Sequence, residues 1–172
     1  MADIQHTFRR ALAFVLTFEG GWSDRPGDPG GATMKGITLA TYSAWLGHAA
    51  SKEELRTITG AAVEAIYRER YWVPPRCQDM PAAVAFAVFD AAVNMGVSTA
   101  AKLLQRAAVV KDDGIVGPIT LRAVGEMHLR PLLSEFIALR GHRYGCLSTF
   151  PAFGKGWMRR LAACHDTALT MA

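Results

Sequence analysis

The sequence predicts a mainly helical fold in one compact body. Residues 82–95 are apolar almost all round, which is typical of a central buried helix. Signals for strands are weak, and a chain of 172 residues suits a single packed core. A first helix is predicted over 7–18, because four apolar residues recur there at helical spacing: Phe8, Leu12, Val15 and Leu16.

A turn-rich segment follows this first helix. Residues 20–36 are dense in glycine and contain two prolines, which forbids a long helix and favours tight turns or a small irregular hairpin. Such chain reversals can fold polar side chains back over the end of the first helix. Thr38 then suits the N-cap of a short helix that runs to Trp45.

Further helices are predicted along the rest of the chain, with no internal repeat between them. Ser51 and Glu54 form the pattern of a capping box that opens a short helix. Pro118 suits the first position of another helix, after a loop over 111–117. The remaining predicted helices are 60–71, which the prolines at 74 and 75 end, then 82–95, 98–110, about 131–144 and about 156–170.

The composition places the chain among ordinary globular proteins, with 51% hydrophobic and 20% charged residues. No stretch approaches the roughly 20 apolar residues that a membrane span needs, so no stable membrane insertion is expected. A net charge of +4 favours an anionic polymer as partner, although it also fits ordinary solubilising charge. The basic residues are scattered and do not alternate with aromatics, which argues against a nucleic-acid partner.

The cysteines and histidines predict neither a disulfide framework nor a metal site. Cys77, Cys146 and Cys164 are odd in number and lack a C-x-x-C spacing, so we expect free core thiols. The histidines show no metal-ligand spacing. Asp112 and Asp113 resemble the start of a calcium loop, but the later acidic ligand is missing. We therefore expect no metal and no cofactor.

Glu19 is the candidate catalytic residue. It continues the apolar stripe of the first helix, four residues after Val15, and stands immediately before Gly20 and Gly21. An apolar face and the negative end of its own helix both favour the protonated form of its carboxyl group. Glycoside hydrolysis needs such an acid to protonate the leaving oxygen. The competing interpretation is a solvated glutamate at a helix end.

Asp24, Asp28 and Thr33 follow Glu19 within the turn-rich segment. In an inverting hydrolase a second carboxylate and a hydroxyl can hold the attacking water, and Asp28 with Thr33 would serve. Each also has a plain structural interpretation. Gly-Asp-Pro-Gly is a common turn, Thr33 fits a turn or strand hydroxyl, and Asp24 fits an exposed turn carboxylate.

The segment from Thr17 to Thr38 resembles the signature of glycoside hydrolase family 108. That family comprises lysozyme-like N-acetylmuramidases, found among phage endolysins and bacterial proteins once described as secretion activators. Its catalytic acid precedes Gly-Gly-aromatic and maps onto Glu19, with Trp22 where tyrosine is frequent. The order of Glu19, Asp28 and Thr33 also resembles inverting phage lysozymes, in which the gap from Asp to Thr is one residue longer.

The resemblance covers nearly the whole chain and continues through 87–96, 104–105, 113–120 and 156–157. It implies a lysozyme-like helical fold with a small hairpin after the first helix. It also implies a catalytic region over 1–96 and a peptidoglycan-binding helical region over 97–172, packed into the same compact body.

Several side chains beyond residue 70 are candidates for contact with sugar. Asp90 and Asn94 lie four apart on one face of the predicted central helix; we expect a structural role for Asp90 and a substrate role for Asn94. Gln105 could offer hydrogen bonds to sugar hydroxyls. Three aromatic residues could offer flat faces to sugar rings, although core packing is the more frequent role of such residues: Tyr71, Trp72 and Trp157.

These observations predict a peptidoglycan hydrolase that cleaves the β-1,4 bond between N-acetylmuramic acid and N-acetylglucosamine, with Glu19 as the general acid and an inverting course. Two alternatives stay open: a lytic transglycosylase, and a non-catalytic protein that binds the wall or assists secretion. We expect a monomer. The N-terminus lacks a conventional signal peptide, so we expect synthesis in the cytoplasm and action in the periplasm or cell wall after release.

Overall fold

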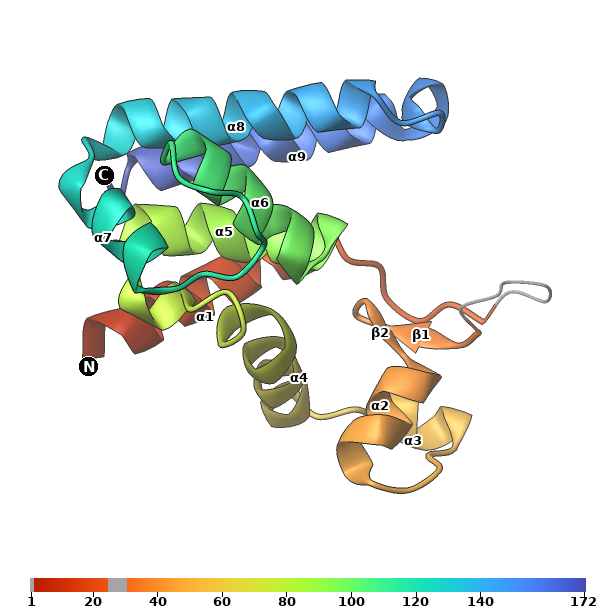
Figure 1. The fold of residues 1–172 in the computed structure, drawn as a ribbon. Coiled ribbons are helices and arrows are strands. Elements are labelled where there is room, and N and C mark those ends of the chain that lie inside the picture. The colour runs from red at the N-terminus through yellow and green to blue at the C-terminus, as the bar shows by residue number, and fades with distance from the viewer. Residues whose placement is uncertain (1, 25–30) are drawn as a thin grey trace. The chain divides into compact units, whose positions relative to one another are not determined.

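The computed structural model describes residues 2–24 and 31–172, and it divides into two compact units (Figure 1). Unit 1 comprises Met1–Ala11 and Tyr71–Ala172, and unit 2 is Leu12–Arg70. The chain passes between them within helix α1 (Ala2–Leu16) and within a short π-helix, η1 (Arg68–Trp72). The predicted class, mainly helical with a small hairpin after the first helix, is confirmed. The functional boundary at residue 96 stays a prediction.

The described part of unit 2 holds the end of α1, the hairpin and three further α-helices. The predicted caps are confirmed: the Thr38 hydroxyl accepts a hydrogen bond from the backbone N–H of Thr41 at 3.0 Å, and Ser51 with Glu54 forms a complete capping box. After Tyr67 the chain continues as a π-helix to Trp72, so the helical path ends where it was predicted to end but changes type. The elements are β1 (Thr33–Met34), β2 (Ile37–Thr38), α2 (Leu39–Leu46), α3 (Lys52–Arg56) and α4 (Gly60–Tyr67).

The hairpin has a two-residue turn rather than an irregular loop. Met34 pairs with Ile37 in antiparallel register, which leaves Lys35 and Gly36 between the strands. Both turn residues have positive φ, 50° and 73°, as a type I′ turn requires. Ser23 pairs with Thr33 through two backbone hydrogen bonds of 2.8 and 2.9 Å, so the chain just after Glu19 lies alongside β1.

Unit 1 is built around the apolar helix that the sequence predicted. Residues of α5 (Ala82–Met95) are buried almost throughout, and this helix packs against α6, α8 and α9. Helices α8 and α9 lie side by side (Figure 1). The other elements of the unit are η2 (Cys77–Asp79), α6 (Val97–Ala107), α7 (Pro118–Glu126), α8 (Leu129–Gly145) and α9 (Phe150–Leu169).

Helix α9 begins at Phe150, well before the predicted start near residue 156. Its first turns contain two glycines, Gly154 and Gly156, which have low helix propensity and therefore led to a later predicted start. Gly154 is required by packing, because a Cβ there would lie 2.7 Å from the ring of Phe150. Pro151 occupies the start of the helix, where its missing N–H costs nothing.

A buried ionic cluster joins three helices of unit 1. The Asp90 carboxylate of α5 accepts one hydrogen bond from Arg140 of α8 and one from Arg160 of α9, each at 2.7 Å. Asp90 and Arg140 are fully buried. Burial opposes the charge of Arg140, but the Asp90 carboxylate outweighs this effect and keeps the pKa of Arg140 above its ordinary value. The structural role expected for Asp90 is confirmed.

The cysteines are free thiols, as predicted, but not all belong to the core. Cys77 and Cys164 are buried, and burial raises the pKa of Cys164 to about 12. Cys146 is exposed, which corrects the prediction, because it follows the last turn of α8 rather than its packed face. Within 2–24 and 31–172, no helix is long and apolar enough to cross a membrane.

The Asp90 cluster predicts a large loss of stability when the Asp90 carboxylate is neutralised. The Asp90→Asn variant removes the negative charge that Arg140 and Arg160 both contact in the core, so we expect the free energy of unfolding to fall by about 3–5 kcal/mol. Denaturant titration measures this change. Asp166→Asn, on the exposed surface of the same bundle, is the matched control and should change it by less than about 0.5 kcal/mol. Equal stability of the two variants would contradict the assignment.

Candidate functional site

Glu19 stands just beyond the end of α1, where the helix unwinds into glycines. The backbone N–H groups of Phe18 and Glu19 both donate to the carbonyl oxygen of Val15, at 2.9 and 3.2 Å, which holds this last turn in place. The Glu19 side chain is partly buried, whereas the glycines after it are exposed. The carboxyl group therefore has a defined position while one side stays open to solvent.

The hairpin turn lies directly against the Glu19 carboxyl group. A Cβ atom built on Gly36 would lie 2.8 Å from Glu19 Oε2 and 2.6 Å from the hydroxyl oxygen of Tyr67. Real Cβ atoms do not approach other atoms so closely, so any larger residue here would force the Glu19 or Tyr67 side chain to move. Gly36 also has a φ of 73°, which independently favours glycine. Two requirements for glycine therefore coincide beside the candidate acid.

Tyr67 fixes the turn from the other side. Its hydroxyl group donates a hydrogen bond to the carbonyl oxygen of Lys35 at 2.9 Å. The Tyr67 side chain comes from α4 and is only 1% exposed, so packing in the core fixes its position. A buried, rigid donor thus holds the strained Lys35–Gly36 turn against Glu19.

Partly exposed aromatic side chains lie elsewhere in unit 2 and could stack on sugar rings. Tyr42 and Trp45 of α2 lie nearly parallel, with their rings 6.2 Å apart, and Trp45 is 37% exposed. The guanidinium carbon of Arg56 lies 5.8 Å from the ring centre of Trp22. The unit therefore carries a defined carboxyl group and flat apolar faces, which a polysaccharide-cleaving enzyme needs.

The loop residues predicted to assist Glu19 have different outcomes. Thr33 lies on β1 and is partly buried, at the start of the hairpin whose turn meets Glu19. Asp28 lies outside the described residues. Asp24 is exposed and forms an ion pair with Lys52 at 2.9 Å, in agreement with its structural interpretation. Catalytic roles for Asp28 and Thr33 stay predictions.

Asn94 and Trp157, predicted to contact substrate, line the same pocket of unit 1. It has a volume of about 190 Å³ and also includes Arg143 and Tyr144. The Tyr144 hydroxyl donates to Asn94 Oδ1 at 2.6 Å, and burial raises the pKa of Tyr144, which keeps this donor protonated. The rings of Tyr144 and Trp157 stack with centres 5.2 Å apart. We call this cavity the Asn94–Trp157 pocket.

Gln105 is buried and holds a loop. Its amide nitrogen donates to Asp113 at 2.8 Å and to the carbonyl oxygen of Ile115 at 3.0 Å, and its amide oxygen accepts from Gly114 N at 2.8 Å. The hydrogen bond that Gln105 donates to the Asp113 carboxylate is the main reason why the pKa of Asp113 lies below its ordinary value. The structure thus shows an anchoring role for Gln105, and its predicted contact with substrate is untested.

Trp72 and Tyr71 also belong to unit 1. Trp72 is 1% exposed and packs edge-on against Phe8 and Phe89, so it is a core residue in the described structure. Tyr71 is partly exposed at the end of the π-helix. Their predicted contacts with sugar remain predictions.

Gly36 and Tyr67 were not singled out from the sequence. A signal for Gly36 existed, since Lys35-Gly36 between Thr33-Met34 and Ile37-Thr38 is the pattern of a two-residue hairpin. Tyr67 offers only its place on the inward face of a predicted helix. Its bond to Lys35 spans 32 positions, which no local pattern reveals.

Comparisons with known proteins agree with this picture. The sequence profile of a family described as Glycosyl hydrolase 108 matches residues 12–96. The solved structure of SagA from Brucella abortus is similar to the chain, with 41% sequence identity and a TM-score of 0.85. The similarity covers 97% of this chain and 96% of that one. No curated protein matches the sequence.

The Gly36 contact predicts that a single methyl group will displace the Glu19 carboxyl. Gly36→Ala should lower the rate of glycan cleavage by at least about tenfold, because the Tyr67 ring is buried and Glu19 is the group that must move. Gly47→Ala is the matched control: Gly47 has a φ of 77° but nothing within 4 Å of an added Cβ.

Both substitutions carry the strain of a left-handed residue, about 1 kcal/mol each. Melting temperatures and cleavage rates, measured on both variants, separate this shared strain from the effect on Glu19. Equal rates in the two variants would show that the turn does not position the acid.

Proposed function

We propose that this chain, which belongs to the glycosyl hydrolase 108 family and is therefore a glycoside hydrolase, acts on bacterial peptidoglycan. The bond cleaved is the β-1,4 linkage between N-acetylmuramic acid and N-acetylglucosamine. The observation that carries the proposal is the Glu19 carboxyl group beyond the end of α1, which lies so close to the hairpin turn that a Cβ atom on Gly36 would meet it at 2.8 Å.

Glu19 is the general acid in this proposal. Protonation of the glycosidic oxygen needs a carboxylic acid at a fixed distance from the bond, and a displaced group loses rate steeply. The last turn of α1 fixes the backbone of Glu19, and its carboxyl group lies close to the Lys35–Gly36 turn that Tyr67 holds. The partly open side leaves room for a sugar oxygen to approach.

The reaction proceeds with inversion in this proposal, with Asp28 and Thr33 holding the water that attacks the anomeric carbon. Thr33 supports it by its place on β1, next to the turn that meets Glu19. A carboxylate and a hydroxyl suffice to orient one water and accept its proton. Neither residue needs a metal ion for this chemistry.

Asn94 and Trp157 bind an acetamido sugar in this proposal. Their pocket combines the amide of Asn94 with the ring of Trp157, which suits the N-acetyl group and the apolar face of such a sugar. Because Asn94 Oδ1 accepts from Tyr144, the orientation of its amide is set before substrate arrives.

Replacement of Glu19 tests the proposal. Glu19→Gln keeps the size of the side chain but removes its acidic proton, so cleavage of purified peptidoglycan should slow by at least about 100-fold. Glu53→Gln, an exposed glutamate of the same unit, should cleave at the parent rate. Mass analysis of released fragments measures both. If the Glu19→Gln variant cleaved peptidoglycan as fast as the parent protein, Glu19 could not be the catalytic acid.

The same digests distinguish the reaction types. Hydrolysis adds one water to each new muramic end, whereas a lytic transglycosylase leaves anhydro ends that lack it. Proton NMR of fresh digests should show the α-anomer at the new reducing end, as inversion of a β-linkage requires. The β-anomer in fresh digests would rule out inversion, and anhydro ends would replace hydrolysis by transglycosylation.

A further inference from the structure

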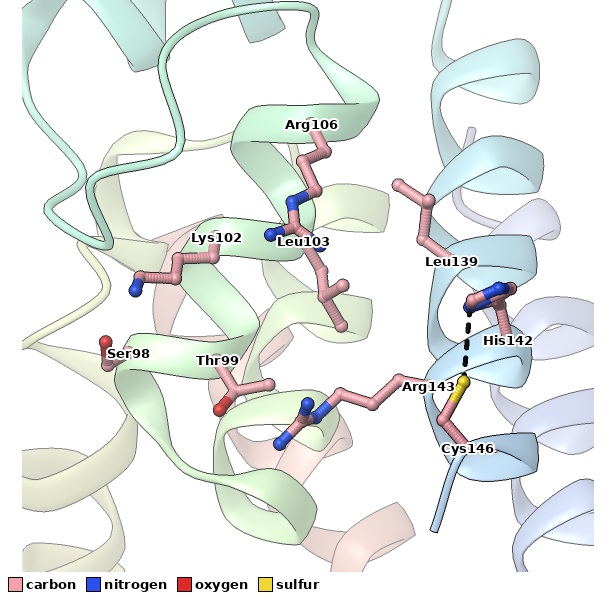
Figure 2. Close-up of a pocket in the computed structure, with 9 residues that line it drawn as sticks. All are labelled: Ser98, Thr99, Lys102, Leu103, Arg106, Leu139, His142, Arg143 and Cys146. Carbon is pink, nitrogen blue, oxygen red and sulfur yellow. Dashed lines mark hydrogen bonds between the residues drawn. The ribbon is translucent and has the colours of Figure 1, made fainter.

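A basic groove lies between α6 and α8 in unit 1, separate from the Glu19 site of unit 2. It has a volume of about 440 Å³, large enough for a short peptide. Lys102 and Arg106 line it from α6, and His142 and Arg143 line it from α8. We call it the α6–α8 groove, and Figure 2 shows the side chains that line it.

The charge of the side chains that line the groove favours a negatively charged ligand. No acidic side chain is among its lining residues. Asp112 neutralises part of the charge nearby, since its carboxylate accepts from Arg106 Nε at 2.6 Å. The guanidinium of Arg106 has further N–H donors beyond Nε, and Lys102 and Arg143 add two more permanent cations. An anionic ligand between the helices would therefore find donors on both of them, Arg106 on α6 and Arg143 on α8.

The groove is not a simple phosphate site. Apolar side chains, Leu103 and Leu139, stand opposite each other on the two helices, and hydroxyl groups of Ser98 and Thr99 complete the lining (Figure 2). No phenylalanine, tyrosine or tryptophan lines it, which argues against a run of stacked bases. A mixed surface of cations, hydroxyls and aliphatic groups fits a peptide with carboxylates and short alkyl side chains.

Arg143 connects this groove to the Asn94–Trp157 pocket, because it lines both. Figure 2 shows the Arg143 side chain reaching from α8 toward α6, where Thr99 lies. A sugar in the Asn94–Trp157 pocket would thus place its substituents beside the groove. In peptidoglycan, alternate sugars carry a stem peptide with free carboxylates.

We propose that the α6–α8 groove binds the carboxylates of a peptidoglycan stem peptide, with Arg143 and Arg106 as the main donors. This inference rests on the proposed function, because it takes the same polymer as ligand. It assigns to the groove a task distinct from cleavage: to hold the peptide of the strand whose sugar occupies the neighbouring pocket.

Direct titration of the full chain tests the groove. The probe is the stem tripeptide alanyl-γ-D-glutamyl-diaminopimelate, compared by calorimetry with the same peptide amidated at its carboxyls. We expect the amidated form to bind at least about tenfold more weakly, since hydrogen bonds to charged groups are the strong ones. Arg106→Gln and Arg143→Gln should each lower the affinity of the protein for the unmodified peptide by about tenfold. Arg122→Gln, an exposed arginine of α7, should leave its affinity unchanged.

Cys146 gives an independent readout. Its thiol lines the groove, 3.8 Å from His142 Nδ1, and the other two cysteines are buried (Figure 2). Alkylation of the native protein should therefore modify Cys146 first, and saturating stem peptide should slow that reaction. Inorganic phosphate at the same ionic strength should not slow it.

Failure of this inference differs from failure of the proposed function. Arg106 does not line the Asn94–Trp157 pocket, so Arg106→Gln should still cleave glycan strands stripped of their peptides at the parent rate. Equal binding of the native and amidated peptides, or unchanged affinity in both arginine variants, would overturn the groove assignment. Protection of Cys146 by phosphate would overturn it as well. If the parent cleaves no glycan at all, with or without peptides, the proposed function fails instead.

Discussion

The contact between a hairpin turn and one carboxyl group is the constraint on which the functional account depends. Gly36 can lie against Glu19 and Tyr67 only because it has no side chain, and Lys35 keeps its left-handed conformation beside it. Tyr67, a buried residue of α4, holds this turn through the hydrogen bond from its hydroxyl group to the carbonyl oxygen of Lys35. The position of the candidate acid therefore depends on α1, the hairpin and α4 together.

In unit 1 the organising interaction is the Asp90 cluster. One carboxylate binds arginines from two other helices, and a turn later Asn94 accepts from Tyr144. Asp90 and Asn94 lie four residues apart on α5, and so do Arg140 and Tyr144 on α8, so two matched pairs align the helices. This alignment brings Asn94 and Trp157 to one pocket and places Arg143 at the border with the α6–α8 groove.

Local patterns predicted most of the fold. The helices that begin after Thr38 and Ser51, and the apolar helix α5, could be predicted from the sequence. The residues that favour each of them lie within or beside the helix itself. Glu19 was singled out as the candidate acid by its place before two glycines and by family resemblance, and its catalytic role stays a prediction. The start of α9 was missed, because Gly154 looks like a helix breaker until the ring of Phe150 packs against it. The role of Tyr67 could not be predicted, since it depends on a contact between segments far apart in the chain.

The most direct test of the account is a double-mutant cycle between Gly36→Ala and Tyr67→Phe, read as the rate of glycan cleavage. The methyl group of the first variant meets the hydroxyl oxygen that the second removes, at 2.6 Å. If the turn and Tyr67 together position Glu19, the double variant will be several-fold faster than the product of the single effects predicts. Strictly multiplicative effects would mean that the two residues act apart, and that the acid is held by something else.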